Sequence, residues 1–332
     1  MAKKELAAHW LRASGLGWAL REARLWSGLV VANYHRVGDG ATSRFNQDLF
    51  SATADDFDAQ IRFFKNNFDV VQPQDLDGVR GAARGRYLQI TFDDGYRDNY
   101  EIAFPILQAQ GVGATFFVAT GYLDKPCVPW WDEIAWMIRG SKRSSLPSSA
   151  WLSGSLPLDQ PTRVNAIREL GRIHLATPLA KQADFLNYLA AATGSGRCDS
   201  ETARDLWMTW DMTREMRRGG MSFGGHTVNH IELSRLSRQE QAEEIRASKQ
   251  RLEEELGEPM SVFSYPFGQV DSFNDDTRSA LHECGMKFAY TYYGGYQRQG
   301  HWDMYNLKRV AIETFKSLDM VEAMVTIPQV FA

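Results

Sequence analysis

The chain has few cysteines and no long apolar run. Its 332 residues include only Cys127, Cys198 and Cys284, which are widely spaced and in no metal-ligand pattern, so a disulfide framework is not expected. No stretch of about 18 apolar residues occurs, so no membrane span is predicted. Arginines and a glutamate interrupt residues 11–25, which therefore do not resemble the apolar region of a signal peptide. These absences favour a cytoplasmic protein.

Net charge is also low. A value of −4 at pH 7 argues against a bulk electrostatic grip on nucleic acid, and 44% hydrophobic residues indicate a globular protein with a sizeable core. Residues 1–28 are predicted to be a solvated helical segment that allows peripheral contact with a membrane surface or a partner. Its basic residues are Lys3, Lys4, Arg12, Arg21 and Arg24. The oligomeric state stays open.

Apolar, strand-like segments alternate with segments of helical periodicity. The predicted strands are 29–34, 69–71, 87–92, 114–118, 221–224, 262–265 and 288–292. Seven strands alternating with helices predict a parallel α/β barrel, complete or distorted, over residues 29–332. The alternation stops near Cys127, so residues 127–206 are predicted to be a helical insertion. Gly224 and Gly225 are interpreted as turn glycines.

Two motifs carry the chemistry. Asp93 and Asp94 follow the predicted strand 87–92, and His226 and His230 are four residues apart after the Gly-Gly pair. Each motif alone also fits a solvated turn or a surface pair. Together, at strand ends, they supply the roughly three protein ligands and the free base that a hydrolytic metal site needs. The sequence therefore predicts a metal-dependent hydrolase.

With Tyr265-Pro266-Phe267-Gly268, these motifs resemble the first three motifs of the polysaccharide deacetylases, carbohydrate esterase family four. The resemblance implies a distorted (β/α)₇ barrel that removes N- or O-linked acetyl groups from sugars with a divalent metal. It implies that Asp94, His226 and His230 bind the metal and that Asp93 is the base. It also implies that the Phe267 N–H is the oxyanion donor. Zn²⁺ suits this ligand set best, and Co²⁺, Ni²⁺ or Fe²⁺ would also fit.

The chain departs from the family pattern at two places. Residues 263–266 lack the arginine that steadies the catalytic aspartate, and no Leu-x-His motif follows Arg309. Tyr34-His35 resembles a branch of biofilm poly-N-acetylglucosamine deacetylases that has a rearranged motif order. His35 is therefore the predicted general acid, with His301 in reserve, and Arg309 is a candidate replacement near Asp93.

Sugar contacts are predicted from aromatic and polar side chains, because aromatic faces stack on sugar rings. The substrate-binding candidates are Trp130, Trp131, Asp132, Tyr265, Trp302 and Arg309. Core packing explains any one of these tryptophans equally well.

The resulting hypothesis is removal of N-acetyl groups from amino sugars of a bacterial polysaccharide or its precursor. One alternative is a cyclic imide or formamide hydrolase of the same fold. A second alternative is a non-catalytic carbohydrate-binding relative.

Overall fold

The computed structural model describes residues 2–159, 162–313 and 316–332, which form two compact units. The barrel unit contains the residues up to 39 together with 49–125 and 207–332. The insertion unit contains 126–206 together with 40–48, a segment that the sequence did not assign to it. Long-range polar contacts hold this segment, since the Asn46 N–H donates to Asp132 Oδ1 (2.8 Å) and Arg168 donates twice to Asp48.

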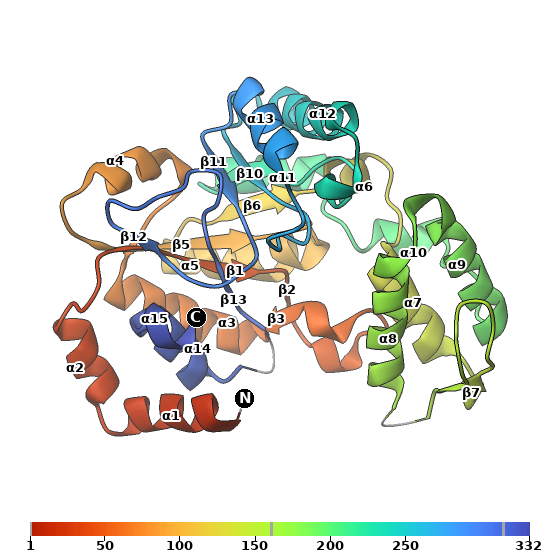
Figure 1. Ribbon diagram of the computed structural model, residues 1–332. Helices are drawn as coiled ribbons and strands as arrows, with labels where there is room; N and C mark the ends of the chain where they lie inside the picture. Colours follow the sequence, from red (N-terminus) through yellow and green to blue (C-terminus); the bar gives the residue numbers. More distant parts are fainter. Residues whose placement is uncertain (1, 160–161, 314–315) are drawn as a thin grey trace. The chain divides into compact units, whose positions relative to one another are not determined.

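Six parallel strands form the core of the barrel unit, and their order in the sheet is β11-β10-β9-β6-β5-β1. Their bounds are β1 (Gly28–Tyr34), β5 (Arg86–Phe92), β6 (Thr115–Val118), β9 (Ser222–Gly225), β10 (Val262–Ser264) and β11 (Phe288–Tyr290). A further segment, 307–311, connects the two edges: Leu307 pairs with Tyr290, and β13 (Val310–Ala311) pairs in parallel with β1. The predicted α/β barrel is confirmed (Figure 1).

The strand predicted at 69–71 is present, but it does not take one of the seven barrel positions. The segment predicted as 69–71 contributes only the two-residue β4 (Asp69–Val70), which pairs with the beginning of β5. The seventh position is taken by 307–311, where Lys308 and Arg309 interrupt the apolar pattern on which the prediction depended. β12 (Gln297–Arg298) pairs antiparallel with the first residues of β1.

Helices surround this sheet, with α3 and α14 on one side in Figure 1 and α12 and α13 on the other. α3 (Ala54–Asn67) begins at Thr53, whose side chain accepts the Asp56 N–H, and it buries Phe57 and Phe64. A capping box starts α12 (Arg238–Leu256): the Ser237 side chain accepts the Glu240 N–H, and the Glu240 side chain accepts the Ser237 N–H. The other elements are α1 (Ala2–Ala13), α2 (Leu16–Glu22), β2 (Arg36–Val37), β3 (Phe50–Ala52), α4 (Leu76–Gly81), α5 (Phe104–Gln110), α6 (Thr120–Asp124), α11 (Trp210–Arg218), α13 (Asp275–Glu283), α14 (Leu318–Thr326) and α15 (Pro328–Phe331).

The insertion unit has its own apolar core, which includes Ile138, Leu170, Phe185 and Leu189. Its elements are α7 (Trp130–Gly140), β7 (Ser145–Leu146), β8 (Leu156–Pro157), α8 (Arg163–Ala176), α9 (Leu179–Thr193) and α10 (Ser200–Arg204). Among the residues that the structure describes, no helix is both long and apolar enough to cross a bilayer.

Gly224 and Gly225 both lie inside β9, which agrees with the predicted strand 221–224 and corrects the interpretation of the pair as turn glycines. The barrel strands crowd there: a Cβ on Gly224 would lie 2.6 Å from the Phe117 ring and 2.9 Å from Val262. The position therefore needs glycine for close packing between strands.

Replacement of Gly224 by alanine should lower the free energy of unfolding by about 1–3 kcal/mol, because the added methyl group overpacks the strand. Gly78→Ala in α4 is the matched control, since a Cβ there meets nothing within 4 Å. Urea denaturation of both variants measures the difference. Equal stability of the two would contradict the packing argument.

Candidate active site

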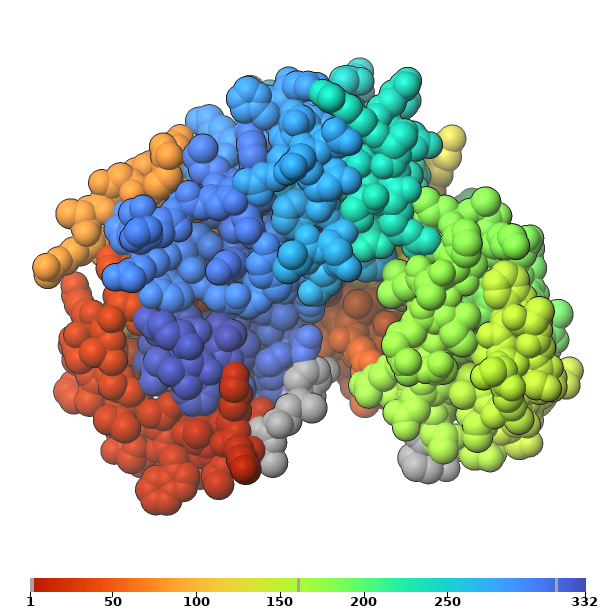
Figure 2. All heavy atoms as spheres, viewed as in Figure 1, coloured from red at the N-terminus to blue at the C-terminus, as the bar shows by residue number. Residues whose placement is uncertain are grey.

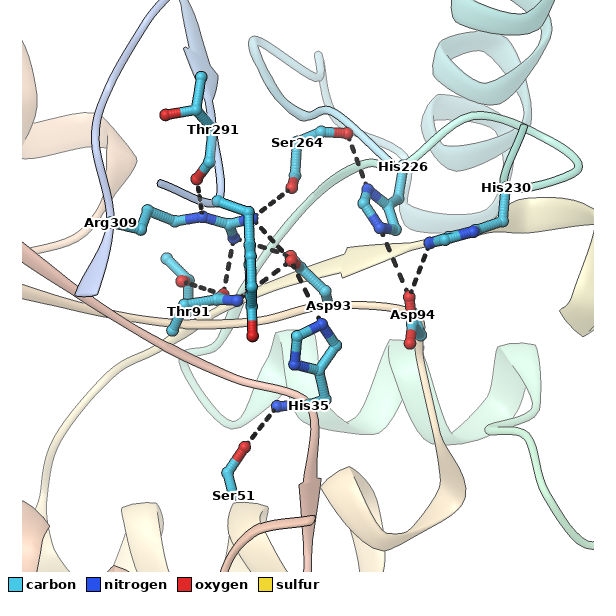
Figure 3. Close-up of polar contacts among 12 residues, drawn as sticks. His35, Ser51, Thr91, Asp93, Asp94, His226, His230, Ser264, Thr291 and Arg309 are labelled. Carbon is cyan, nitrogen blue, oxygen red and sulfur yellow. Dashed lines mark hydrogen bonds and ion pairs between the residues drawn. The ribbon is translucent and has the colours of Figure 1, made fainter. Parts of the chain in front are cut away.

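The polar side chains that the sequence singled out meet where the barrel strands end. Asp93 and Asp94 follow β5, His35 follows β1, and His226 follows β9. Arg309 reaches the same place from the closing segment 307–311 (Figure 3). The carboxyl ends of parallel barrel strands face one side, so these residues share one site although their sequence positions span most of the chain.

Asp94, His226 and His230 form a compact ligand set. Asp94 Oδ1 lies 3.4 Å from His226 Nε2 and 3.1 Å from His230 Nε2. One ligand atom from each residue lies within 4.8 Å of the others. Tetrahedral zinc with bond lengths near 2.0–2.1 Å separates its ligand atoms by about 3.3 Å. The spacing therefore fits a zinc-sized ion.

Hydrogen bonding orients His226 for this role. Its Nδ1 lies 2.7 Å from the Ser264 carbonyl oxygen, which can only accept, so Nδ1 carries the proton and Nε2 faces Asp94. Asp94 Oδ1 is buried and makes no hydrogen bond within the described residues. With its proton on Nδ1, neutral His226 turns the lone pair of Nε2 toward Asp94, and a divalent cation between them would bind both electron-rich atoms. The residues present thus fit a divalent metal.

Electrostatics agree with a shared cation. Burial raises the pKa of Asp94, but the charge of His230 and the contacts with both imidazoles outweigh it and hold the pKa well below its usual range. Burial lowers the pKa of His226, but the two aspartates outweigh it and raise the pKa. For His230, burial prevails and the pKa is lowered. Asp94 thus stays an anionic ligand at neutral pH.

The loop that carries His230 is held by a carboxylate outside the ligand set. Glu244 on α12 accepts the N–H groups of Val228 (2.8 Å) and Asn229 (3.1 Å), and its other oxygen accepts the Asn229 side-chain amide. Thr227 and His230 both have positive φ, 63° and 52°. Glu244 therefore stabilises a loop conformation that L-residues rarely adopt.

Two strand ends turn sharply at Asp94 and Phe267. The Gly95 N–H donates to the Asp93 carbonyl around Asp94 (φ 75°), and the Gly268 N–H donates to the Pro266 carbonyl around Phe267 (φ 62°). These are γ-turns of the strained, positive-φ kind. Four of the five positive-φ non-glycine residues in the described ranges lie at this site, a concentration typical of functional sites.

Asp93 is held by a buried ion pair. Arg309 donates to both of its oxygens, at 2.9 Å and 2.7 Å, and the Asn33 side-chain amide donates to Oδ2 at 3.2 Å. Burial raises the pKa of Asp93, but the charges of Arg309 and His226 and the Arg309 hydrogen bonds outweigh it, so the pKa lies below its usual value. Asp93 is therefore an ionised carboxylate next to the ligand set.

Arg309 is fixed by further acceptors. It donates to the Thr291 carbonyl (2.6 Å), Asn33 Oδ1 (2.6 Å) and Ser264 Oγ (3.0 Å). The predicted proximity to Asp93 is confirmed. The prediction that Arg309 contacts substrate is wrong, because this side chain is fully buried and its donors are occupied by protein atoms.

His35 lies beside Asp93, with its Nε2 4.0 Å from Asp93 Oδ2. Its backbone is held on both sides: the N–H donates to Ser51 Oγ, and the carbonyl accepts the Asn99 side-chain amide. The Tyr292 ring packs edge-on against the imidazole at 5.5 Å between centroids. The Tyr-His pair at the first strand therefore reaches the same site as Asp93.

His301 and Trp302 lie elsewhere. The His301 N–H donates to Arg298, which pairs with Gly28 at the beginning of β1, seven residues or roughly 20 Å of strand from His35. Trp302 is partly buried and packs against the apolar cluster that includes Leu29, Leu76 and Val79. The structure thus removes His301 as the reserve acid and Trp302 as a sugar contact.

Tyr265 is also a packing residue. Its hydroxyl donates to the Tyr305 carbonyl at 3.0 Å, and its ring stacks on Phe273 with centroids 4.1 Å apart. Only 1% of its surface is exposed, so it offers no contact to a sugar.

The three candidates of the insertion unit are largely buried within it. Asp132 is fully buried and accepts the Asn46 N–H, which argues against a hydroxyl-binding role. Trp131 is 8% exposed, and Trp130 stacks on His174 at 4.4 Å. These contacts match the packing interpretation of the two tryptophans.

Sequence reasoning missed three residues that support the site: Asn33, Glu244 and Ser264. Asn33 had a signal, because it is the one amide in the otherwise apolar strand Leu29–Tyr34. Glu244 lies among many charged residues of α12 and could not be distinguished from them. Ser264 acts on His226 through its backbone carbonyl, which no side-chain pattern reveals.

Comparison with known proteins places this geometry in a family. Residues 80–176 and 180–289 match the family described as polysaccharide deacetylase. YxkH of Bacillus subtilis (strain 168), a polysaccharide deacetylase by name, is 20% identical over 288 residues, which cover 86% of this chain and 71% of that protein. The poly-beta-1,6-N-acetyl-D-glucosamine N-deacetylase of Escherichia coli (strain K12) is 33% identical over 118 residues, 32% of this chain and 17% of that protein.

Solved structures share the fold. The Streptococcus pyogenes deacetylase PplD in complex with acetate superposes with a TM-score of 0.57 at 19% identity, covering 92% of this chain and 99% of that one. IcaB from Ammonifex degensii gives a TM-score of 0.58 at 20% identity, covering 90% and 97%. Because the family match spans more than half of the sequence, the chain belongs to the polysaccharide deacetylase family.

Proposed function

We propose that this protein is a metal-dependent N-deacetylase of amino sugars in a bacterial polysaccharide or its precursor. The observation that carries the proposal is the juxtaposition of two differently held carboxylates. Asp94 faces two imidazoles, whereas its neighbour Asp93 is paired with Arg309 and left out of the ligand set. A binding module has no use for an ionised base beside a metal site, but a hydrolase needs both.

Asp94, His226 and His230 would hold the divalent ion, for which Zn²⁺ is the best-fitting choice. When bound, the ion polarises the acyl carbonyl and lowers the pKa of a water molecule. Asp93 would accept the proton of the water molecule that attacks the acyl carbon. Arg309 keeps Asp93 ionised and fixes its direction.

Phe267 and His35 supply the remaining groups. The Phe267 ring packs against His230 with centroids 5.2 Å apart, so residue 267 adjoins the ligand set, and its backbone N–H is our candidate for the oxyanion donor. His35, beside Asp93, would give a proton to the departing amine. Each group acts at a different atom of the amide.

The substrate class is supported by the relatives. The E. coli relative is named for poly-beta-1,6-N-acetyl-D-glucosamine, and PplD was solved with acetate, the acid that deacetylation releases. The E. coli match spans 32% of this chain, so the polymer itself is part of the proposal. We therefore infer an N-acetylglucosamine-type sugar as the first substrate to test.

Exchange of each adjacent carboxylate should separate the two roles. Asp93→Asn should lower the rate of acetate release from N-acetylglucosamine oligosaccharides by about 10²- to 10⁴-fold, because the base is lost, and should retain bound metal. Asp94→Asn should lose metal, since it removes one of three ligands. Elemental analysis of protein loaded with zinc or cobalt measures the second effect independently of activity.

Asp77→Asn is the control for this pair, because Asp77 is an exposed carboxylate on α4. Full activity of Asp93→Asn would refute the assignment of the base. Stoichiometric metal in the wild-type protein without release from any acetylated sugar would direct the search to imides and formamides, or to a binding-only protein.

Replacement of Arg309 by methionine should raise the pKa of Asp93, because burial is then no longer opposed by the guanidinium. Asp93 would be protonated over more of the acid range, so the acid limb of the kcat/KM profile should move to higher pH. The rate at neutral pH should fall on the order of 100-fold through lost orientation. Arg309→Lys should recover part of it, and Arg298→Met on exposed β12 is the control. An unchanged pH profile would leave Arg309 a purely structural role.

His35→Gln should distinguish a general acid from a positioning residue. Release of an amine requires protonation of the leaving nitrogen, whereas 4-nitrophenolate leaves unprotonated. Deacetylation of sugars should therefore fall by about 10²- to 10⁴-fold while hydrolysis of 4-nitrophenyl acetate is largely spared. His301→Gln, at the other end of β1, should behave as wild type. Equal loss on both substrates would show that His35 acts by positioning Asp93.

A further inference from the structure

The first 25 residues expose an unusual amount of large apolar surface. Five side chains there are 50–67% exposed: Leu6, Trp10, Leu16, Trp18 and Leu25. They make up half of the large exposed hydrophobic residues in the part of the chain that the structure describes. Figure 2 shows these N-terminal helices (red) at the surface next to the C-terminal helices (dark blue).

α1 has two different faces. Ala8 is buried in the main core, and His9 and Arg12 contact Asp319 on α14 at 2.9 Å and 2.7 Å. Leu6 and Trp10 are four residues apart, so they share the face that α14 leaves uncovered. A helix docked by one face that presents tryptophan on the other is typical of an interfacial helix.

A basic cavity of about 670 Å³ adjoins this surface, and Leu25 lines it. Its charged lining residues are Glu22, Arg24, Lys65, Asp69, Arg84 and Arg86, four cations against two anions. The whole chain has a formal net charge of −4 at pH 7, so the charge of this cavity is opposite in sign to that of the protein.

Arg86 is the inner cation of this cavity. Its guanidinium lies over the Phe68 ring, 5.5 Å from the centroid, and its Nη1 is buried with no hydrogen-bond partner among the described residues. Burial, and then the charge of Arg24, lower the pKa of Arg86. A buried donor beside a second cation is stabilised by an anion that enters the cavity.

We propose that the N-terminal helices and this cavity together dock the protein on a membrane surface, with an anionic phospholipid headgroup in the cavity. Trp10, Trp18 and Leu25 would enter the interfacial region, and Arg24, Arg84 and Arg86 would hold the phosphate. A second copy of the chain suits this surface less well, because a two-fold contact would oppose the same cations.

Docking here would fix the orientation of the enzyme. The cavity is lined by residues that directly precede β1 and β5, whereas the active site lies at the ends of these strands, roughly 20 Å away. The active site would therefore face away from the bilayer. That orientation suits a sugar chain in the aqueous phase. The docking proposal itself does not depend on the proposed deacetylase activity.

Vesicle co-sedimentation of the full chain tests the proposal, with phosphatidylcholine vesicles that contain or lack phosphatidylglycerol. Binding should require phosphatidylglycerol and weaken as salt rises. Arg24→Gln combined with Arg84→Gln should weaken binding roughly 30-fold, which is about fivefold per cation. Trp10→Ala combined with Trp18→Ala should weaken it at least as much and abolish the blue shift of tryptophan fluorescence.

Matched controls come from exposed residues elsewhere. Lys142→Gln combined with Arg143→Gln makes the same charge change in the insertion unit, and Val270→Ala removes a 72% exposed apolar side chain. Both should bind like wild type. All variants should deacetylate soluble oligosaccharides like wild type, which separates this test from the test of function.

Inorganic phosphate as competitor distinguishes the sources of the anion. Weak competition at equal ionic strength supports a headgroup held at a surface, whereas full displacement would overturn the membrane assignment in favour of a soluble phosphate site. Equal binding to both vesicle types, unchanged binding of the two double variants, or a dimer that protects the tryptophans would also overturn the proposal.

Discussion

The buried ion pair between Asp93 and Arg309 is the interaction on which the barrel unit depends. Arg309 lies in the segment that connects the last parallel strand to the first, and Asp93 follows the strand next to the first. A lone buried charge costs several kcal/mol, so each residue lowers the cost of burying the other. The ion pair that ties the closing segment to the sheet is therefore also the one that keeps Asp93 ionised.

This pairing also explains how two adjacent carboxylates do different work. Identical side chains one residue apart would share a proton or a metal if their surroundings were alike. The γ-turn at Asp94 directs it toward His226 and His230, while Arg309 and Asn33 hold Asp93 on the other side. Backbone strain at the strand end thus gives the two adjacent carboxylates different partners.

Much of the barrel and of the candidate site could be predicted from the sequence, because strands 29–34 and 87–92 are apolar and the residues of the ligand set have a recognisable spacing. The closing segment could not, since Lys308 and Arg309 conceal its strand character, and neither could segment 40–48, which depends on long-range contacts to Asp132 and Arg168. Local patterns report burial and turns. They do not report which distant backbone atom will accept a hydrogen bond, as Ser264 does from His226.

The site also shows why the order of motifs along a barrel is free to change. His35 comes from the first strand and Arg309 from the last segment, yet both contact Asp93, because these two strands are neighbours once the sheet closes. What chemistry requires is a cation and an imidazole on the β1 side of the base, whichever end of the chain supplies them. A sequence lacking an arginine or histidine at the expected motif therefore cannot be judged inactive until the residues that flank the closing strands have been placed.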